Sequence, residues 1–148
     1  MDPMMKYPRL RDLEAVARRR IPPFIFAYLD SGTGHDVTKT ANAARYERLT
    51  LTPQFLRGRV DPDTSVTLLG RKYAAPFGVA PVGLSSTIWP GAERILAATA
   101  KAHGFPYTLS TVAGESIERV TAVGGDMAWF QLYAPHDRDI CFDIMKRA

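Results

Sequence analysis

The second half of the chain alternates between short apolar runs and longer amphipathic stretches. The three short runs are GVAPVG, PYTLST and MAWFQLY. Each precedes a stretch in which apolar residues recur at helical spacing. Residues 90–104 carry clear helix signals, because Pro90 suits a first position and Gly104 suits the residue past the end. Strands that alternate with helices predict a parallel α/β arrangement over residues 76–148.

The first half of the chain is predicted to be mainly helical. Helices are expected over residues 9–20, 24–32 and 37–48. Pro22 and Pro23 separate the first two, since proline is tolerated only at a helix start. SVTLLG and RKYAAP then fit two short strands around Gly70. We therefore expect an N-terminal helical segment with a short β-hairpin over residues 1–75, followed by βα units over residues 76–148.

The βα pattern favours a (β/α)₈ barrel over a dinucleotide-binding fold. No G-x-G-x-x-G follows any of the three predicted strands. A complete barrel needs about 250 residues, whereas this chain has 148. The predicted fold is therefore an incomplete TIM barrel, about three βα units, preceded by a helical segment.

Two polar residues stand out on otherwise apolar strands. Alternation places Thr108 and Ser110 on one face of their strand. Trp129, Gln131 and Tyr133 share one face of the next strand. Parallel strands buried on both sides are usually apolar, so Ser110 and Gln131 need polar partners. Either a neighbouring loop or a bound ligand would satisfy them, and spacing alone leaves both alternatives open.

Pro81 interrupts the first apolar run. Proline gives a β-ladder no N–H, so it marks the point where the strand stops pairing. In a barrel this point lies near the carboxyl end, where active sites are built. The backbone of Val82, Gly83 and Leu84 would then be free to face a flat ligand. The alternative is an ordinary transition from strand to loop.

Composition and charge exclude several classes of protein. The chain is 46% hydrophobic and 23% charged, which is typical of a globular domain. Its net charge of +4 is only mildly basic, and the cluster Arg18, Arg19 and Arg20 suits a solvated helix end. Nucleic-acid binding through these arginines is therefore the last-ranked alternative. No apolar stretch reaches the roughly 20 residues of a membrane span.

The sequence offers little catalytic chemistry of its own. Cys141 is the single cysteine, so neither a disulfide nor a cysteine metal site is expected. His35, His103 and His136 suit solvated or structural roles, and no nucleophile–base pair or metal-ligand cluster is evident. Tyr28 lies in an apolar helix, where packing is the usual role of a lone tyrosine. A cytoplasmic location is expected, with peripheral contact to the inner face of the membrane left open.

Four motifs in order give the chain a family resemblance. They are IPPFIFAYLDSGTG, GVAPVGLSSTIWPGAE, TLSTVAGESIE and WFQLY. Together they resemble the FMN-dependent 2-hydroxy acid dehydrogenases and oxidases, which include L-lactate dehydrogenases, glycolate oxidase and mandelate dehydrogenase. The resemblance runs from about residue 9 to residue 148. It implies oxidation of a lactate-like L-2-hydroxy acid to the 2-oxo acid, with hydride passing to flavin N5.

The resemblance also implies roles for individual residues. Tyr28 and Tyr133 would contact the small-molecule 2-hydroxy acid. FMN would be bound by Pro81, Val82, Gly83, Ser110, Gln131 and Tyr133. Many relatives have threonine where this chain has Val82, so only backbone contacts are expected there. Some relatives carry tryptophan where this chain has Val112, which leaves more room over the substrate.

No catalytic residue is assigned within the chain. The family's proton-accepting histidine, carboxylate-binding arginine and flavin-facing lysine come from later barrel strands, expected beyond Ala148. We therefore expect the isolated 148-residue chain to be inactive. The alternative is a non-catalytic flavin- or partner-binding fragment that pairs with another chain. Full-length relatives are expected to form homo-oligomers.

Overall fold

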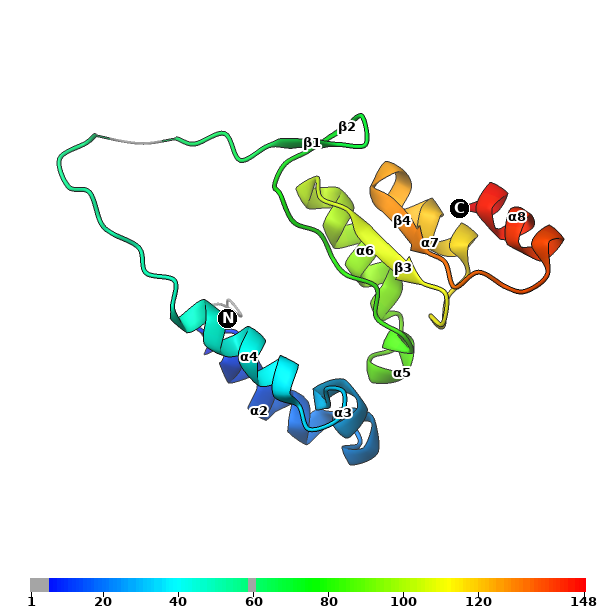
Figure 1. Ribbon diagram of the computed structural model, residues 1–148, viewed down its shortest axis with the longest axis horizontal. Helices are drawn as coiled ribbons and strands as arrows, with labels where there is room; N and C mark the ends of the chain where they lie inside the picture. Colours follow the sequence, from blue (N-terminus) through cyan, green and yellow to red (C-terminus); the bar gives the residue numbers. More distant parts are fainter. Residues whose placement is uncertain (1–5, 59–60) are drawn as a thin grey trace. The chain divides into compact units, whose positions relative to one another are not determined.

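The computed structural model describes residues 6–58 and 61–148. The chain divides into two compact units, Met1–Pro62 and Asp63–Ala148. Figure 1 shows the helices of the first unit and the mixed helices and strands of the second. Each unit packs largely against itself.

Three helices make up the described part of the first unit. They are α2 (Arg11–Arg20), α3 (Pro23–Asp30) and α4 (Val37–Glu47). Helix α2 stops where expected, because Pro22 and Pro23 cannot continue its hydrogen-bond ladder. Phe26 is buried, with the Arg18 guanidinium 4.4 Å from its ring centroid. Asp30 pairs with Lys39 Nζ at 2.8 Å, so α3 and α4 are joined by charge.

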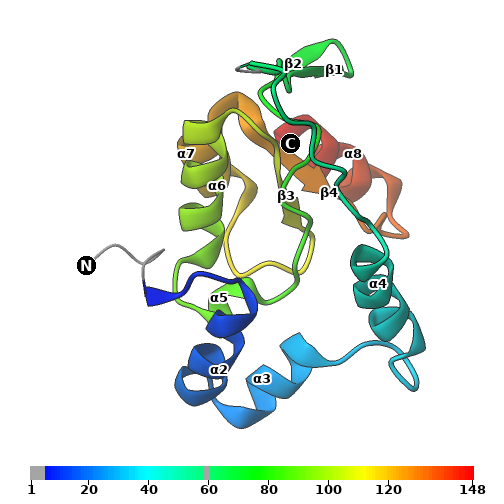
Figure 2. The same ribbon diagram turned by 90° about the vertical axis from the view of Figure 1, so that its left-hand side faces the viewer.

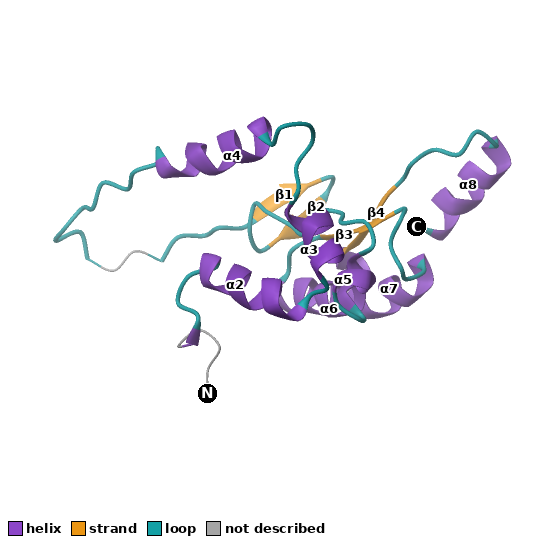
Figure 3. Ribbon diagram, turned by 90° about the horizontal axis from the view of Figure 1, so that it is seen from below, coloured by secondary structure: helices purple, strands orange, loops and turns teal. Residues whose placement is uncertain are grey.

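The second unit contains two small sheets, which Figure 3 shows in orange. Strands β1 (Val66–Leu68) and β2 (Arg71–Tyr73) form an antiparallel hairpin. Strands β3 (Tyr107–Ser110) and β4 (Ala128–Gln131) are parallel and in register from end to end. The described residues of this unit form a mixed arrangement of helices and strands, without a closed barrel.

The first apolar run forms less strand than its sequence predicts. Only Val79 pairs, as a single parallel bridge to Tyr107. Its N–H donates to the Pro106 carbonyl at 2.8 Å, and Thr108 N–H donates to the Val79 carbonyl at 3.0 Å. Pro81 follows two residues later and has no N–H to extend the ladder. The prediction of a full strand is therefore wrong in extent, although the parallel neighbour is in the predicted place.

Helices follow each parallel segment, as predicted. The long ones are α6 (Ala92–His103), α7 (Ile117–Gly124) and α8 (Arg138–Arg147). Gly104 ends α6 in the left-handed conformation, and Phe105 N–H donates to the Ala100 carbonyl at 3.1 Å. The sequence does not predict the four-residue helix α5 (Ser85–Ile88) or the 3₁₀ turn η1 (Gly125–Met127). Both are too short to show a hydrophobic period.

The core lies between β3 and the helices α6 and α7, which run side by side in Figure 2. Its buried members are Ala97, Ala100, Tyr107, Leu109, Ile117 and Val120. The two alanines let α6 approach closely. Gly124 also allows close packing, because an added Cβ would lie 3.2 Å from Ala128 Cβ and 3.3 Å from Ala97 Cβ. This packing fixes the direction of the strands.

The hairpin packs at the amino end of the parallel strands. Ala74 N–H donates to the Gly104 carbonyl at 2.8 Å. Trp129 Nε1 donates to the Tyr73 hydroxyl at 3.1 Å, and the two rings meet edge to face. The hairpin thus belongs to the second unit. The opposite, carboxyl end of the strands carries the polar residues.

Helix α8 is tied to α7 by an ion pair. Arg147 Nε lies 2.7 Å from Glu118 Oε1. The hydrogen bond from Arg147 holds the pKa of Glu118 at about 2. Both groups are exposed, so the pair is screened by salt and orients α8 more than it stabilises it. In the described ranges, 6–58 and 61–148, no helix combines the length and apolar character required to cross a membrane.

Leu109→Ala should destabilise the second unit by about 2–5 kcal/mol, because it leaves a cavity between β3 and the helices. Urea unfolding followed by tryptophan fluorescence measures this, since Trp89 and Trp129 both lie in that unit. Leu69→Ala is the control, because Leu69 is 86% exposed and should change stability by less than about 0.5 kcal/mol. Equal losses in the two variants would contradict this placement of the core.

Candidate functional site

Ser110 and Gln131 meet at the carboxyl end of the parallel sheet. They are register partners, and the Ser110 hydroxyl donates to Gln131 Oε1 at 3.2 Å. Ser110 is buried and also accepts a hydrogen bond from Val112 N–H at 3.3 Å. The protein itself therefore satisfies Ser110. Gln131 is partly buried, and within the described residues its Nε2 group has no hydrogen-bond partner.

Thr111 fixes the backbone where β4 ends. Its hydroxyl donates to the Gln131 carbonyl and accepts from Tyr133 N–H at 2.9 Å. Sequence alternation places Thr111 with the core-facing residues and does not predict its link to the next strand. The only available signal is a hydroxyl at the end of an apolar strand. Tyr133, whose backbone Thr111 holds, is 63% exposed beside this edge.

The segment after the first parallel bridge lies along the same edge. Pro81 and Val82 are exposed and Gly83 is partly exposed. Leu84 N–H donates to the Val112 carbonyl at 3.0 Å, which joins this segment to the loop after β3. Leu84 has a φ of 54°, a conformation that is strained for a branched residue. The backbone here is therefore held in a specific path and not left as a free loop.

The buried carboxylate of Glu93 is hydrogen-bonded to both segments of this edge. It lies in the first turn of α6 and is fully buried. Ser86 N–H and Gly114 N–H both donate to Oε1 at 3.0 Å, and the Ser86 hydroxyl donates to Oε2. Burial alone would raise the pKa of Glu93, but these hydrogen bonds hold it below its ordinary value. The sequence suggests only a helix-dipole role, since nothing in it shows that this glutamate is buried.

The charge on Glu93 also affects the pKa of Tyr107 in β3. Burial, reinforced by this negative charge, raises the pKa of Tyr107 to about 12. The Tyr107 phenol therefore stays protonated at neutral pH and serves as a core residue. It is not a candidate acid–base group.

Tyr28 lies in the first unit and is 52% exposed on α3. Tyr28 is therefore not packed in the core of this unit, which is the usual role of a lone tyrosine.

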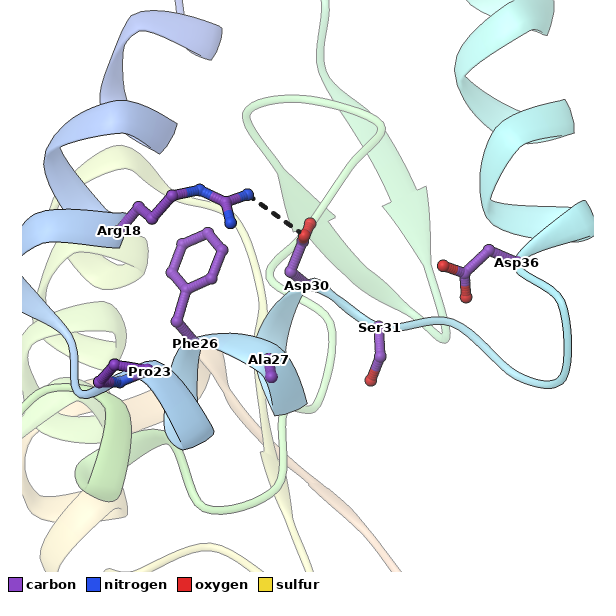
Figure 4. Close-up of a pocket in the computed structure, with 7 residues that line it drawn as sticks. All are labelled: Arg18, Pro23, Phe26, Ala27, Asp30, Ser31 and Asp36. Carbon is purple, nitrogen blue, oxygen red and sulfur yellow. Dashed lines mark ion pairs between the residues drawn. The ribbon is translucent and has the colours of Figure 1, made fainter.

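A hollow of about 370 Å³ in the same unit is drawn in Figure 4. Its lining residues are Arg18, Pro23, Phe26, Ala27, Asp30, Ser31 and Asp36. Arg18 lies 3.6 Å from Asp30, so these two charges in the hollow are paired with each other.

The histidines and the cysteine form no reactive constellation among the described residues. His103 stacks on Phe105 at the amino end of β3, with ring centroids 6.0 Å apart. His35 and His136 are exposed, and Cys141 is a partly buried free thiol. Within residues 6–58 and 61–148, no group of three or more His, Cys, Asp or Glu side chains could hold a metal ion.

The carboxyl edge suits a flat ligand with hydrogen-bond acceptors. Among the described residues the Gln131 amide N–H₂ group has no partner, and the residues from Pro81 to Gly83 are exposed or partly exposed. Val82 and Val112 add exposed apolar surface beside these polar groups. Apolar walls with a few fixed polar groups are typical of cofactor sites. A ring carbonyl oxygen would be a suitable acceptor for the Gln131 amide.

Comparison with known proteins gives this edge a family context. The family model for FMN-dependent dehydrogenase matches residues 17–148. A 4-hydroxymandelate oxidase from Amycolatopsis orientalis is 38% identical over 144 residues, which are 97% of this chain and 40% of the relative. An L-lactate dehydrogenase from Xanthobacter autotrophicus is 39% identical over 137 residues, which are 93% of this chain and 35% of the relative.

Solved structures agree with the sequence relatives. A crystal structure of mandelate oxidase superposes with a TM-score of 0.85 at 38% identity, covering 96% of this chain and 41% of that one. Another similar structure is that of a mandelate oxidase mutant with a monooxide FMN adduct, at 37% identity and a TM-score of 0.81. The chain thus spans about two-fifths of the length of the relatives it matches. With the family model matching nearly all of it, the chain belongs to the FMN-dependent dehydrogenase family.

Proposed function

We propose that this chain supplies part of the FMN site of an enzyme that oxidises an L-2-hydroxy acid to the 2-oxo acid. The observation that carries the proposal is the pairing of Ser110 with Gln131 at the carboxyl end of parallel strands. This is the end of a (β/α)₈ barrel at which active sites form. Two relatives at 38% and 39% identity are named for oxidising 4-hydroxymandelate and for dehydrogenating L-lactate.

The fold we infer is the N-terminal portion of such a barrel. The segment around Val79, β3 and β4 are parallel neighbours in chain order, as consecutive barrel strands are. Helices α6 and α7 pack against β3 and β4 through the core. On this view residues 76–148 are three βα units, and the helices and hairpin of residues 1–75 precede them.

The chain's own residues would bind and orient the cofactor. Gln131 would donate its free amide N–H to a ring carbonyl, while Ser110 holds that amide in place. The backbone of Pro81, Val82 and Gly83 would lie against the ring. FMN, when bound, supplies the acceptor for the hydride that leaves the substrate α-carbon. Tyr133 would lie between cofactor and substrate, since it is exposed beside Gln131.

The substrate we infer is a 2-hydroxy acid bound through its carboxylate. Tyr28 and Tyr133 are the hydroxyl donors that the family resemblance assigns to it, and both are at least half exposed in their own units. Val112 is 48% exposed at the edge, which leaves space for a side chain on the substrate. We assign proton removal to none of this chain's histidines.

A second candidate is a flavin-binding chain that pairs with another chain. It is favoured by β4, which within the described residues pairs on one side only. An unpaired strand edge is a template for a further strand. Helix α8 also exposes Ile140, Phe142 and Met145, which adds apolar surface to the same unit.

Gln131→Ala should weaken FMN binding to the 148-residue chain about tenfold, since it removes one hydrogen bond and loosens Ser110. Quenching of FMN fluorescence on titration measures the Kd. Gln54→Ala is the matched control, because Gln54 is an exposed residue of the first unit and should leave the Kd unchanged. An unchanged Kd in Gln131→Ala, or equal losses in both variants, would remove Gln131 from the site.

The wild-type chain loaded with FMN should not reduce the flavin when L-lactate or (S)-mandelate is added. A missing general base costs roughly 10²–10⁴ in rate, and loss of carboxylate positioning adds to this. Loss of flavin absorbance under anaerobic conditions is the readout. Bleaching at a catalytic rate would show that a residue of this chain acts as the base, with His136→Ala as the first variant to examine.

A further inference from the structure

We propose that Glu93 is a positioning residue that holds the two loops of the FMN edge at a fixed separation. The relevance of these loops to the cofactor rests on the function inferred above. The positioning itself is independent of FMN. The first loop is residues 82–84, which lead from the first parallel bridge into α5 (Ser85–Ile88), and the second loop is residues 111–114, after β3.

The Glu93 carboxylate bonds to both loops at once. Oε1 accepts from Ser86 N–H in α5, directly after the first loop, and from Gly114 N–H in the second loop, each at 3.0 Å. Oε2 accepts from the Ser86 hydroxyl. A shared acceptor atom sets the distance between the two amide nitrogens, so neither loop can move without breaking a hydrogen bond to a charged group.

A second observation shows that the loops are closely packed at this point. A Cβ added to Gly114 would lie 3.0 Å from Ser86 Cβ and 3.6 Å from Glu93 Oε1. Only glycine therefore fits at this position without displacing Ser86. The absence of a side chain at Gly114 therefore allows the close approach of Ser86 to this loop.

The hydrogen-bond network extends from Glu93 to the cofactor edge. Ser86 lies in α5, whose N-terminal residue Ser85 donates its hydroxyl to the Val82 carbonyl at 3.3 Å. Leu84 N–H donates to the Val112 carbonyl. Val112 N–H in turn donates to Ser110 Oγ, the atom that holds Gln131. A shift of either loop would thus be transmitted to Gln131.

The energetics favour a positioning role over simple stabilisation. Among the described residues Glu93 forms no ion pair, so neutral donors alone compensate its burial. A buried carboxylate without a cation is costly, and an apolar residue of similar volume would fill the space at a lower cost in free energy. What an apolar residue cannot do is accept hydrogen bonds from two loops.

Glu93→Ala and Glu93→Gln distinguish a local effect on the two loops from a general loss of stability. Amide hydrogen exchange on the 148-residue chain should rise at least tenfold at Ser86 and Gly114 in Glu93→Ala, while Leu109 in β3, which lies between two parallel neighbours, stays protected. Glu93→Gln should restore most of the protection, because its Oε1 can still accept from both amides. Glu118→Ala, which removes a carboxylate from α7, should change neither loop. Unchanged protection in Glu93→Ala, or an equal rise at every amide, would overturn the proposal.

If Glu93→Ala does not fold, the pH dependence of amide protection in wild type and in Glu93→Gln tests the same proposal. The pKa of Glu93 in the folded chain is held below its ordinary value of 4.5. The stabilisation that the ionised carboxylate provides is therefore complete above pH 4.5, and it is lost as the pH falls through the lower pKa of the folded chain. After correction for intrinsic exchange, protection at Ser86 and Gly114 should fall in wild type below pH 4.5 and stay flat in Glu93→Gln. The same pH dependence of amide protection in wild type and in Glu93→Gln would overturn the proposal.

FMN affinity distinguishes this proposal from the proposed function. If the wild-type chain binds FMN, Glu93→Ala should raise the Kd about tenfold and Glu93→Gln should restore it. If the wild-type chain binds no FMN, the proposed function fails, while the exchange experiment still decides whether Glu93 holds the loops.

Discussion

A buried carboxylate must be surrounded by hydrogen-bond donors, and this constraint organises the second unit. The donors to Glu93 are the Ser86 hydroxyl and the backbone amides of Ser86 and Gly114, which lie far apart in sequence. Their convergence brings the segment after Val79 beside the segment after β3. The polar pair Ser110 and Gln131 then falls next to this junction and not among the apolar residues of the core.

The two faces of the parallel strands have separate tasks. One face contributes Tyr107 and Leu109 to a hydrophobic core with α6 and α7. The other face is closed at its amino end by Tyr73 of the hairpin and presents Ser110 and Gln131 at its carboxyl end. Stability therefore comes from residues that a bound ligand would not touch. Such a division leaves the carboxyl edge free for binding chemistry.

The elements that could be predicted from the sequence are those with strong local signals. Helix α6 is predictable because Pro90 and Gly104 mark its ends, and alternation correctly sets Ser110 apart from the core face. Helix α5, with four residues, shows no period, and the strand before Pro81 shrinks to one bridge. The burial of Glu93 depends on the close approach of Gly114 to Ser86, a tertiary contact with no local pattern. The cofactor and substrate roles assigned to the site residues all stay predictions, namely those of Pro81, Val82, Gly83, Ser110, Gln131 and the two tyrosines.

The most direct test of the FMN edge is an amide chemical-shift map of the 148-residue chain titrated with FMN. We predict saturable shifts at Gly83, Val112 and the Gln131 side-chain amide, with Leu69 in the hairpin turn unaffected. These groups lie together at the carboxyl edge, whereas Leu69 lies in the exposed turn between β1 and β2. Shifts confined to other surfaces, or none at saturating FMN, would contradict the assignment of this edge to the cofactor.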